Sequence, residues 1–242
     1  MKPRCRQWIP LTLAFTGIAL ALSGCVPQAA SEQGQEIKKL YDFFSYFALA
    51  VYALTAGLIS WSILRYRKKK DDDELPVQFK KNVGLEILWF AIPQIIVVVL
   101  FIASVDTLSK VDKVAPRPAY TVDVTAFQWG WNFQYTGEGV TIHSTPEDNG
   151  HIYLPLRKNV QFNITSQDVI HSFYVPEMLI KRDALPGKIN HIVITPTDEG
   201  VYEGKCAELC GVFHDRMNFY VHVVSDAKFQ SWLAEQSRQQ GA

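Results

Sequence analysis

Cysteine, net charge and internal repetition are all scarce in this sequence. The 242 residues contain equal numbers of acidic and basic side chains and only four cysteines: Cys5, Cys25, Cys206 and Cys210. A neutral total charge points to no particular partner, and we expect no nucleic-acid ligand. The absence of a repeat argues against a repeat architecture. What the chain does have is an uneven distribution of apolar residues: long apolar runs fill the first half, and the second half has the composition of a soluble domain.

Residues 1–24 have the pattern of a lipoprotein signal peptide. A basic start is followed by an apolar region, Trp8 to Leu22, that is too short to span a bilayer. The region ends in Leu22-Ser23-Gly24-Cys25, which resembles the bacterial lipobox, where cleavage precedes lipidation of the cysteine. We therefore expect lipid on Cys25 and an extracytoplasmic segment over residues 25–40. The alternative is a third membrane helix with an incidental cysteine.

Two further apolar runs predict transmembrane helices at residues 41–66 and 83–106, because each is long enough to cross the ~30 Å hydrocarbon core. The loop between them, 67–82, is rich in lysine and is expected in the cytoplasm by the positive-inside rule. Both flanking regions then lie outside a bacterial cell membrane. Glu86, near the start of the second run, is a candidate functional acid. Its alternative is a carboxylate that only reaches the lipid headgroups.

From residue 107 to 225 the pattern changes to short strands. Apolar and polar residues alternate at 120–124 and at 160–164, and turn residues punctuate the runs. No long helical pattern separates them, which favours a β-sandwich or small barrel. The predicted fold is thus a two-helix transmembrane hairpin followed by an all-β domain, with residues 226–242 as a short helix that frays.

Twelve residues of this domain, from Cys206 to Met217, combine two thiols, an imidazole and a thioether. This mixture suits copper better than zinc, because a structural zinc site uses four Cys or His ligands and needs no methionine. Cys206 and Cys210 could place both sulfurs between two metal ions, with His214 and the distant His171 as terminal imidazoles. The alternative, a structural disulfide, leaves His214 and Met217 unexplained. The other histidines are expected to be ordinary surface or strand-face residues: His143, His151, His191 and His222.

At these residues the sequence resembles subunit II of the cytochrome c oxidases. The copper motif of that family, C-x-E-x-C-G-x-x-H-x-x-M, is matched at every defined position from Cys206 to Met217. Three more segments match in the same order, around Glu86, at residues 128–135 and at residues 169–187. The segment Lys181-Arg182-Asp183 and the lipobox indicate the actinobacterial branch. The resemblance covers nearly the whole chain after the signal.

The resemblance implies a cupredoxin-type barrel and a dinuclear copper A centre, in which two cysteines bridge the ions and two histidines are terminal ligands. A methionine and one backbone carbonyl complete the set. The implied ligands are His171, Cys206, Glu208, Cys210, His214 and Met217. The Glu208 side chain would also reach a magnesium ion shared with subunit I. Trp131 would be the electron-input residue beneath a cytochrome docking site, and Glu86 would lie at the mouth of a proton-uptake channel.

Two tryptophans, Trp129 and Trp131, are two positions apart on an expected strand, so both are expected on one face of the sheet. That face is either core or contact surface. Without the copper motif, both would be read as packing residues. The choice matters because the implied input residue is one of the two.

The function implied by the resemblance is acceptance of electrons from cytochrome c and their relay to the haem of subunit I. Oxygen would be reduced to water there, coupled to proton pumping. Expected partners are subunits I and III, membrane lipid and a separate cytochrome, either soluble or a membrane-bound dihaem protein, because no Cys-x-x-Cys-His motif is present. Acidic residues outnumber basic ones over residues 115–225, which would attract a basic cytochrome. Scattered solubilising charge explains the same excess equally well.

Two related proteins are alternatives. The copper-free counterpart of quinol oxidases keeps the barrel, but all six ligand positions are present here. The copper domain of nitrous oxide reductase shares the ligand loop, but not the membrane hairpin.

Overall fold

The computed structural model describes residues 29–67, 78, 81–113 and 116–241. The predicted signal peptide, the lipidation site Cys25 and most of the loop at 67–82 lie outside these residues. The chain divides into two compact units. One spans Lys39–Lys110 and the other joins the residues up to Lys38 with Val111–Ala242.

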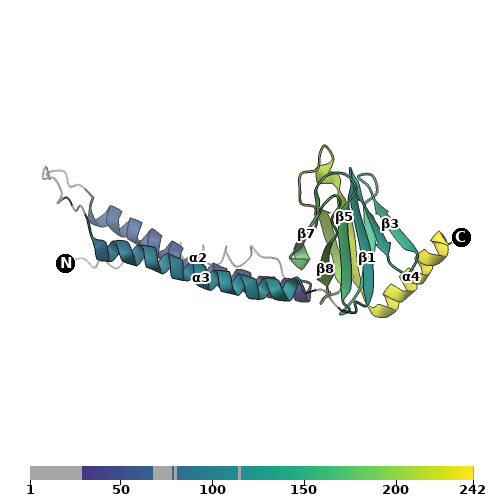
Figure 1. Cartoon of the computed structure of the whole chain (residues 1–242), viewed down its shortest axis with the longest axis horizontal. Coiled ribbons are helices and arrows are strands. Elements are labelled where there is room, and N and C mark those ends of the chain that lie inside the picture. Colours follow the sequence, from purple (N-terminus) through teal and green to yellow (C-terminus); the bar gives the residue numbers. More distant parts are fainter. Residues whose placement is uncertain (1–28, 68–77, 79–80, 114–115, 242) are drawn as a thin grey trace, which may run out of the picture. The chain divides into compact units, whose positions relative to one another are not determined.

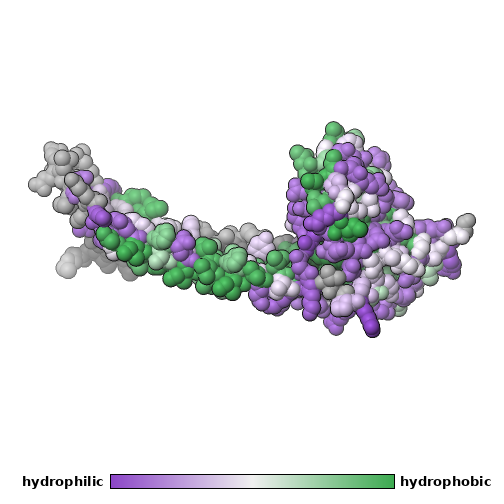
Figure 2. All heavy atoms as spheres, viewed as in Figure 1, coloured by the Kyte–Doolittle hydropathy of each residue, from purple (hydrophilic) through white to green (hydrophobic). Residues whose placement is uncertain are grey.

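Two long helices, α2 (Glu32–Arg65) and α3 (Val83–Val111), carry the apolar runs (Figure 1). Their apolar side chains are exposed along almost the whole length, as Figure 2 shows. Such exposure is unfavourable in water but not in the hydrocarbon interior of a membrane. Polar side chains within the spans donate to carbonyls of their own helix: Ser45 to Tyr41 (2.8 Å), Thr55 to Val51 (2.9 Å) and Ser104 to Leu100 (2.8 Å). No water is needed to satisfy these groups, so both helices are suited to a bilayer.

Helix α2 begins at Glu32, well before the apolar run that starts at residue 41. Ser31 caps the helix: its Oγ accepts from the Gly34 N–H (3.0 Å) and its carbonyl accepts from the Gln35 N–H (2.9 Å). The first turns are polar, so hydropathy marks only the later part of the helix.

The segment that leads into α2 is bound to the β-domain by main-chain hydrogen bonds. The Ala30 N–H donates to the Glu177 carbonyl (2.9 Å), and the Thr197 N–H donates to the Ala30 carbonyl (3.0 Å). The Ser31 hydroxyl donates to the Met178 carbonyl at 3.0 Å and is fully buried. This chain segment therefore belongs to the β-domain, although more than seventy residues separate it from the first strand.

In the residues that the structure describes, ten strands form two five-stranded sheets. The first sheet contains, in spatial order, β3 (Val140–Ser144), β2 (Gly130–Tyr135), β1 (Tyr120–Phe127), β5 (Val160–Ser166) and β8 (Asn190–Ile194). The second contains β4 (Gly150–Pro155), β10 (Asn218–Val224), β9 (Gly200–Cys206), β6 (His171–Val175) and β7 (Ile180–Ala184). The pairs β1–β5 and β4–β10 are parallel and the others are antiparallel. The predicted two-helix hairpin with an all-β sandwich is confirmed.

The inner faces of the two sheets enclose an aromatic core. Phe133 and Phe219 lie 5.1 Å apart between ring centroids, and Phe173 and Phe219 lie 5.0 Å apart. Helix α4 (Asp226–Gln240) follows the last strand and buries Phe229 and Leu233. The predicted fraying tail is therefore a helix held to the domain by its apolar face.

We expect Gly34→Ala to lower the stability of the β-domain. A Cβ at this position would lie 2.2 Å from the Met178 carbonyl oxygen, so the docked segment would have to move, at roughly 1–3 kcal/mol. Gly84→Ala, also in the first turn of a long helix, meets its nearest atom at 3.7 Å and is the matched control. Thermal unfolding of the full-length variants in detergent measures the difference. Equal unfolding midpoints for the two variants would show that the segment before α2 is not packed against the β-domain.

Candidate metal centre

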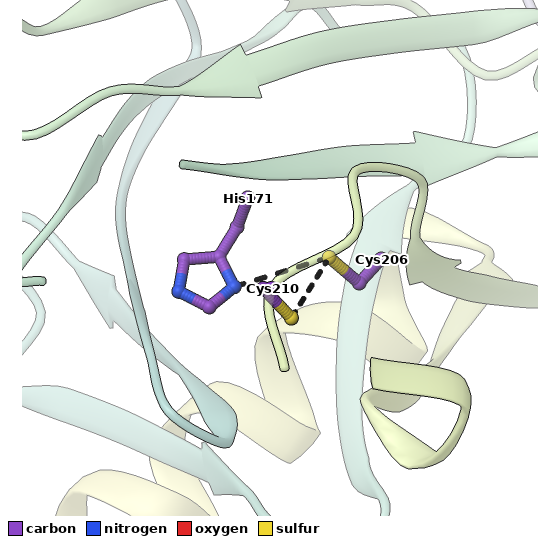
Figure 3. Close-up of side chains that lie close together, drawn as sticks. All are labelled: His171, Cys206 and Cys210. Carbon is purple, nitrogen blue, oxygen red and sulfur yellow. Dashed lines mark hydrogen bonds between the residues drawn. The ribbon is translucent and has the colours of Figure 1, made fainter. Parts of the chain in front are cut away.

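Three potential ligands meet at one end of the second sheet (Figure 3). Cys206 ends β9, His171 begins β6, and Cys210 lies in the loop that follows β9. The pairing of β6 with β9 brings the first two together across the sheet. The Sγ atoms of Cys206 and Cys210 are 3.8 Å apart, and Cys206 Sγ is 3.9 Å from His171 Nδ1. All three ligand atoms lie within 4.8 Å of one another.

The remaining predicted ligands approach the same two sulfurs. A short 3-10 helix, η3 (His214–Arg216), places His214 Nδ1 3.6 Å from Cys210 Sγ. Met217 Sδ lies 3.3 Å from Cys210 Sγ, and the Glu208 carbonyl oxygen lies 3.3 Å from Cys206 Sγ. The structure thus brings together the five groups of the sequence motif and the distant His171.

The two cysteines are free thiols and not a disulfide. A disulfide needs a sulfur–sulfur distance of about 2.05 Å, far below the observed 3.8 Å. Metal–thiolate bonds are about 2.3 Å long, so two sulfurs that share an ion can be up to about 4.6 Å apart. Free sulfurs at 3.8 Å, with imidazole and thioether beside them, fit a soft metal ion such as copper.

Asp168 orients the buried imidazole of His171. Its Oδ1 lies 2.9 Å from His171 Nε2, which leaves Nδ1 directed at Cys206. The carboxylate accepts further bonds from the Val169 N–H (2.6 Å) and the Gln128 N–H (2.7 Å). Burial opposes ionisation of Asp168, but these bonds and the one to His171 outweigh it and lower the pKa of the carboxyl group. Sequence reasoning missed Asp168, although its position three residues before His171 was a usable signal.

The two thiols ionise at different pH. Burial opposes ionisation of Cys206, but hydrogen bonds to His171 and to the backbone outweigh it and lower its pKa. Burial and the neighbouring Cys206 raise the pKa of Cys210. One thiolate therefore forms readily, and the second loses its proton when a cation compensates the added charge.

The loop between the cysteines is held by the segment before β2. The Cys210 carbonyl accepts from Gln128 Nε2 (2.7 Å) and from Trp129 Nε1 (3.3 Å). Gly211 has a φ of +128°, which side-chain-bearing residues rarely adopt, and a Cβ there would lie 3.0 Å from the Trp129 ring. The glycine of the motif is thus required by the close approach of the tryptophan.

The expectation that Trp129 and Trp131 share one face is wrong. Strand β2 begins at Gly130, so the alternation of a strand does not extend back to Trp129. Trp131 is 0% exposed, lies in the core and donates from Nε1 to the Met217 carbonyl at 3.2 Å. Trp129 is half-buried and contacts Phe213 edge to face at 5.0 Å between centroids. Of the two tryptophans only Trp129 reaches the surface, and the assignment of Trp131 as the electron-input residue stays a prediction.

The side chain of Glu208 is exposed and forms an ion pair with Lys181, whose Nζ is 3.1 Å from Oε1. Lys181 also pairs with Asp183 at 3.0 Å. Within the described ranges, His171, Cys206 and Cys210 are the one group of three or more His, Cys, Asp or Glu side chains with metal-binding geometry. The described residues therefore do not themselves surround a magnesium ion at Glu208.

Glu86 has a local role at the start of α3. Its Oε1 accepts from the Asn82 N–H at 3.4 Å, and Asn82 Oδ1 accepts from the Leu85 N–H at 3.1 Å. These bonds cap the helix. A further role in proton uptake is compatible with this position and is not required by it.

Exposed apolar side chains surround the cysteine loop. The exposed fractions reach 83% at Leu209 and 78% at Val212, and Ile170 beside His171 is 50% exposed. Figure 2 shows hydrophobic atoms at this end of the β-domain. Apolar side chains gathered beside a site indicate a contact surface for another protein.

The chain is similar to known proteins over most of its length. The family model described as "Cytochrome C oxidase subunit II, periplasmic domain" matches residues 142–224, and that of the corresponding transmembrane domain matches residues 19–107. The probable cytochrome c oxidase subunit 2 of Streptomyces avermitilis is 35% identical over 87% of this chain and 78% of its own length. That of Nocardia farcinica is 32% identical over 95% of this chain and 80% of its own length. The solved periplasmic domain of subunit II from Bradyrhizobium japonicum matches 52% of this chain and 99% of its own, with 29% identity and a TM-score of 0.49.

We expect Asp168→Asn to weaken copper binding by roughly 10–100-fold, as is typical when the partner of a ligating histidine is altered. The amide offers one acceptor where the carboxylate offers two, and it carries no charge. Asp148→Asn, in the exposed turn before β4, is the matched control. Competition with a copper chelator, with full-length protein in detergent, measures the affinity. Equal retention by the two variants would show that Asp168 does not position His171.

Proposed function

We propose, from the premise that the chain belongs to the cytochrome c oxidase subunit II family, that its β-domain receives electrons at a dinuclear copper centre. The chain is a subunit of a haem–copper oxidase complex, which implies subunit I as a partner. It is a membrane protein whose β-domain lies on the extracytoplasmic side. The observation that carries the proposal is the pair of free cysteine sulfurs, 3.8 Å apart, among imidazole and thioether groups.

The proposed ligands divide into bridging and terminal groups. Cys206 and Cys210 would bridge the two ions, and His171 and His214 would bind one ion each. Met217 and the Glu208 carbonyl would complete the two coordination spheres. Bound there, a thiolate-bridged copper pair supplies a one-electron relay in which charge is spread over both ions.

The protein itself restrains the ligands and shields them from solvent. His171 and Met217 are 0% and 1% exposed, so little solvent reaches that side of the centre. Asp168 fixes one imidazole, and main-chain bonds from the Cys206 N–H to the Met217 carbonyl (3.1 Å) and from the Ala207 N–H to the Ser172 carbonyl (3.0 Å) fix the loop. Ligands that move little when an electron arrives favour rapid transfer.

Electron input is proposed through Trp129 in place of Trp131. The Trp129 indole is half-buried and hydrogen-bonds to the carbonyl of the ligand Cys210, so it links the surface to the centre. Leu209 and Val212 extend the exposed apolar surface beside it, where a cytochrome could dock. The donor would be a separate cytochrome c, either soluble or a membrane-bound dihaem protein.

Several finer assignments are supported by the sequence resemblance. They include lipid on Cys25, a proton-uptake role for Glu86, subunit III as a partner and proton pumping by the complex. Magnesium at Glu208 would need ligands from subunit I and would compete with the ion pair to Lys181. The proposed segments are a signal peptide (1–24), an extracytoplasmic segment (25–40), a first transmembrane helix (41–66), a cytoplasmic loop (67–82), a second transmembrane helix (83–106), the cupredoxin domain (107–225) and a C-terminal tail (226–242).

Copper content tests the proposal. The full-length chain isolated from its membrane should contain two copper ions per chain, and Cys206→Ser should reduce this because an alcohol is a poor copper ligand. His191→Gln, on the outer side of β8, is the matched control and should keep both ions. One copper per chain, or a Cys206–Cys210 disulfide in the isolated protein, would contradict a dinuclear centre and favour a structural role.

Trp129→Phe should slow electron input from reduced cytochrome c by roughly tenfold or more, about 1.4 kcal/mol in activation free energy. Trp131→Phe should instead lower stability by about 1–3 kcal/mol, because the buried bond to the Met217 carbonyl and core volume are lost. Stopped-flow oxidation of reduced cytochrome c by the oxidase complex measures the rate, and thermal unfolding measures stability. Slower input in the Trp131 variant alone would restore Trp131 as the input residue.

A further inference from the structure

Two histidines remote from the cysteine loop face each other on the outer side of the second sheet. His151 lies on β4 and His222 on the parallel neighbour β10, with Tyr220 opposite His151 and Tyr153 opposite His222. Buried and half-exposed residues alternate along β10, so His222 points away from the core. It lies five positions from Met217, about 16 Å along an extended chain. The pair is therefore separate from the proposed copper centre.

The two imidazole rings are held edge to edge. His151 Nδ1 lies 2.7 Å from His222 Nε2. The His222 ring stacks on Tyr153 at 4.6 Å and the His151 ring stacks on Tyr220 at 5.2 Å between centroids. Trp232 stacks on the other side of Tyr153 at 4.6 Å. Tyrosines thus support both rings and keep the two nitrogen atoms facing each other.

We infer that His151 and His222 form a second metal site, which takes a divalent ion, Cu(II) above all. Metal–imidazole bonds are about 2.0–2.1 Å long, so adjacent nitrogens are about 2.9–3.4 Å apart around one ion. The observed 2.7 Å is a hydrogen-bond distance, so the two nitrogens need to separate only slightly to bind an ion between the rings. Cu(II) also binds nitrogen ligands more tightly than the other common divalent ions.

The protonation states suit a metal ion. Burial and the neighbouring His151 lower the pKa of His222, so this ring is neutral at pH 7 and can bind. In the pair one ring donates a hydrogen bond to the other. When a metal ion binds, the donor ring carries its proton on its outer nitrogen instead, and both inner nitrogens become ligands with no net loss of a proton.

No third His, Cys, Asp or Glu completes this pair in the part of the chain that the structure describes. Water would fill the remaining positions of the ion. The site should therefore exchange its metal readily, unlike the buried cysteine site.

Electron paramagnetic resonance after addition of one equivalent of Cu(II) tests the site. The probe is added to the full-length chain, purified without a polyhistidine tag and already saturated at its cysteine site. We expect a new single-copper spectrum with splitting from two nitrogen nuclei. His151→Gln and His222→Gln should each lose this splitting, and His191→Gln, at an exposed histidine on the other sheet, should keep it. Unfolding midpoints of the variants verify that they are folded.

Three results would overturn the inference. The first is a parent spectrum without splitting from two nitrogens. The second is an unchanged spectrum in the folded His222→Gln variant. The third is equal retention of Zn(II) and Cu(II) in equilibrium dialysis, which would contradict the preference for Cu(II).

Discussion

The structure depends on keeping two cysteine sulfurs close together without letting them bond. At 3.8 Å the Sγ atoms of Cys206 and Cys210 are near enough to share metal ions and too far apart for a disulfide. That separation is set by the backbone: one cysteine ends a strand, and the carbonyl of the other is bound by Gln128 and Trp129. The glycine that follows, with its positive φ, lets the tryptophan approach. A site for a soft metal follows from this restraint together with the neighbouring ligands, and the proposed dinuclear centre depends on it.

Much of the fold was predictable because its signals are local. Long apolar runs mark the two membrane helices, and alternation with turn residues marks the strands. The loop from Cys206 to Met217 stood out for the same reason, since five of the six proposed ligand groups lie within these twelve residues. His171 is distant in sequence, and it was identified through the family resemblance; the pairing of β6 with β9 provides the physical reason for its position.

The features that sequence reasoning missed depend on contacts between distant segments. The polar start of α2 carries no apolar pattern, and its position is explained by hydrogen bonds to Glu177 and Met178. The placement of Trp129 and Trp131 on one face was predicted wrongly because β2 starts between them, and a strand boundary is the hardest feature to predict. His151 and His222 were expected to be ordinary surface histidines, because the parallel pairing of β4 and β10 that joins them leaves no sequence pattern.

The central claim is that one electron is shared by two copper ions held between Cys206 and Cys210. The most direct test is the electron paramagnetic resonance spectrum of the full-length chain as isolated, partly oxidised and without added metal. The account predicts hyperfine structure from a single electron shared equally between two copper nuclei, and its loss in Cys210→Ser. A spectrum from one copper nucleus, or no copper signal in protein whose cysteines are free, would contradict it.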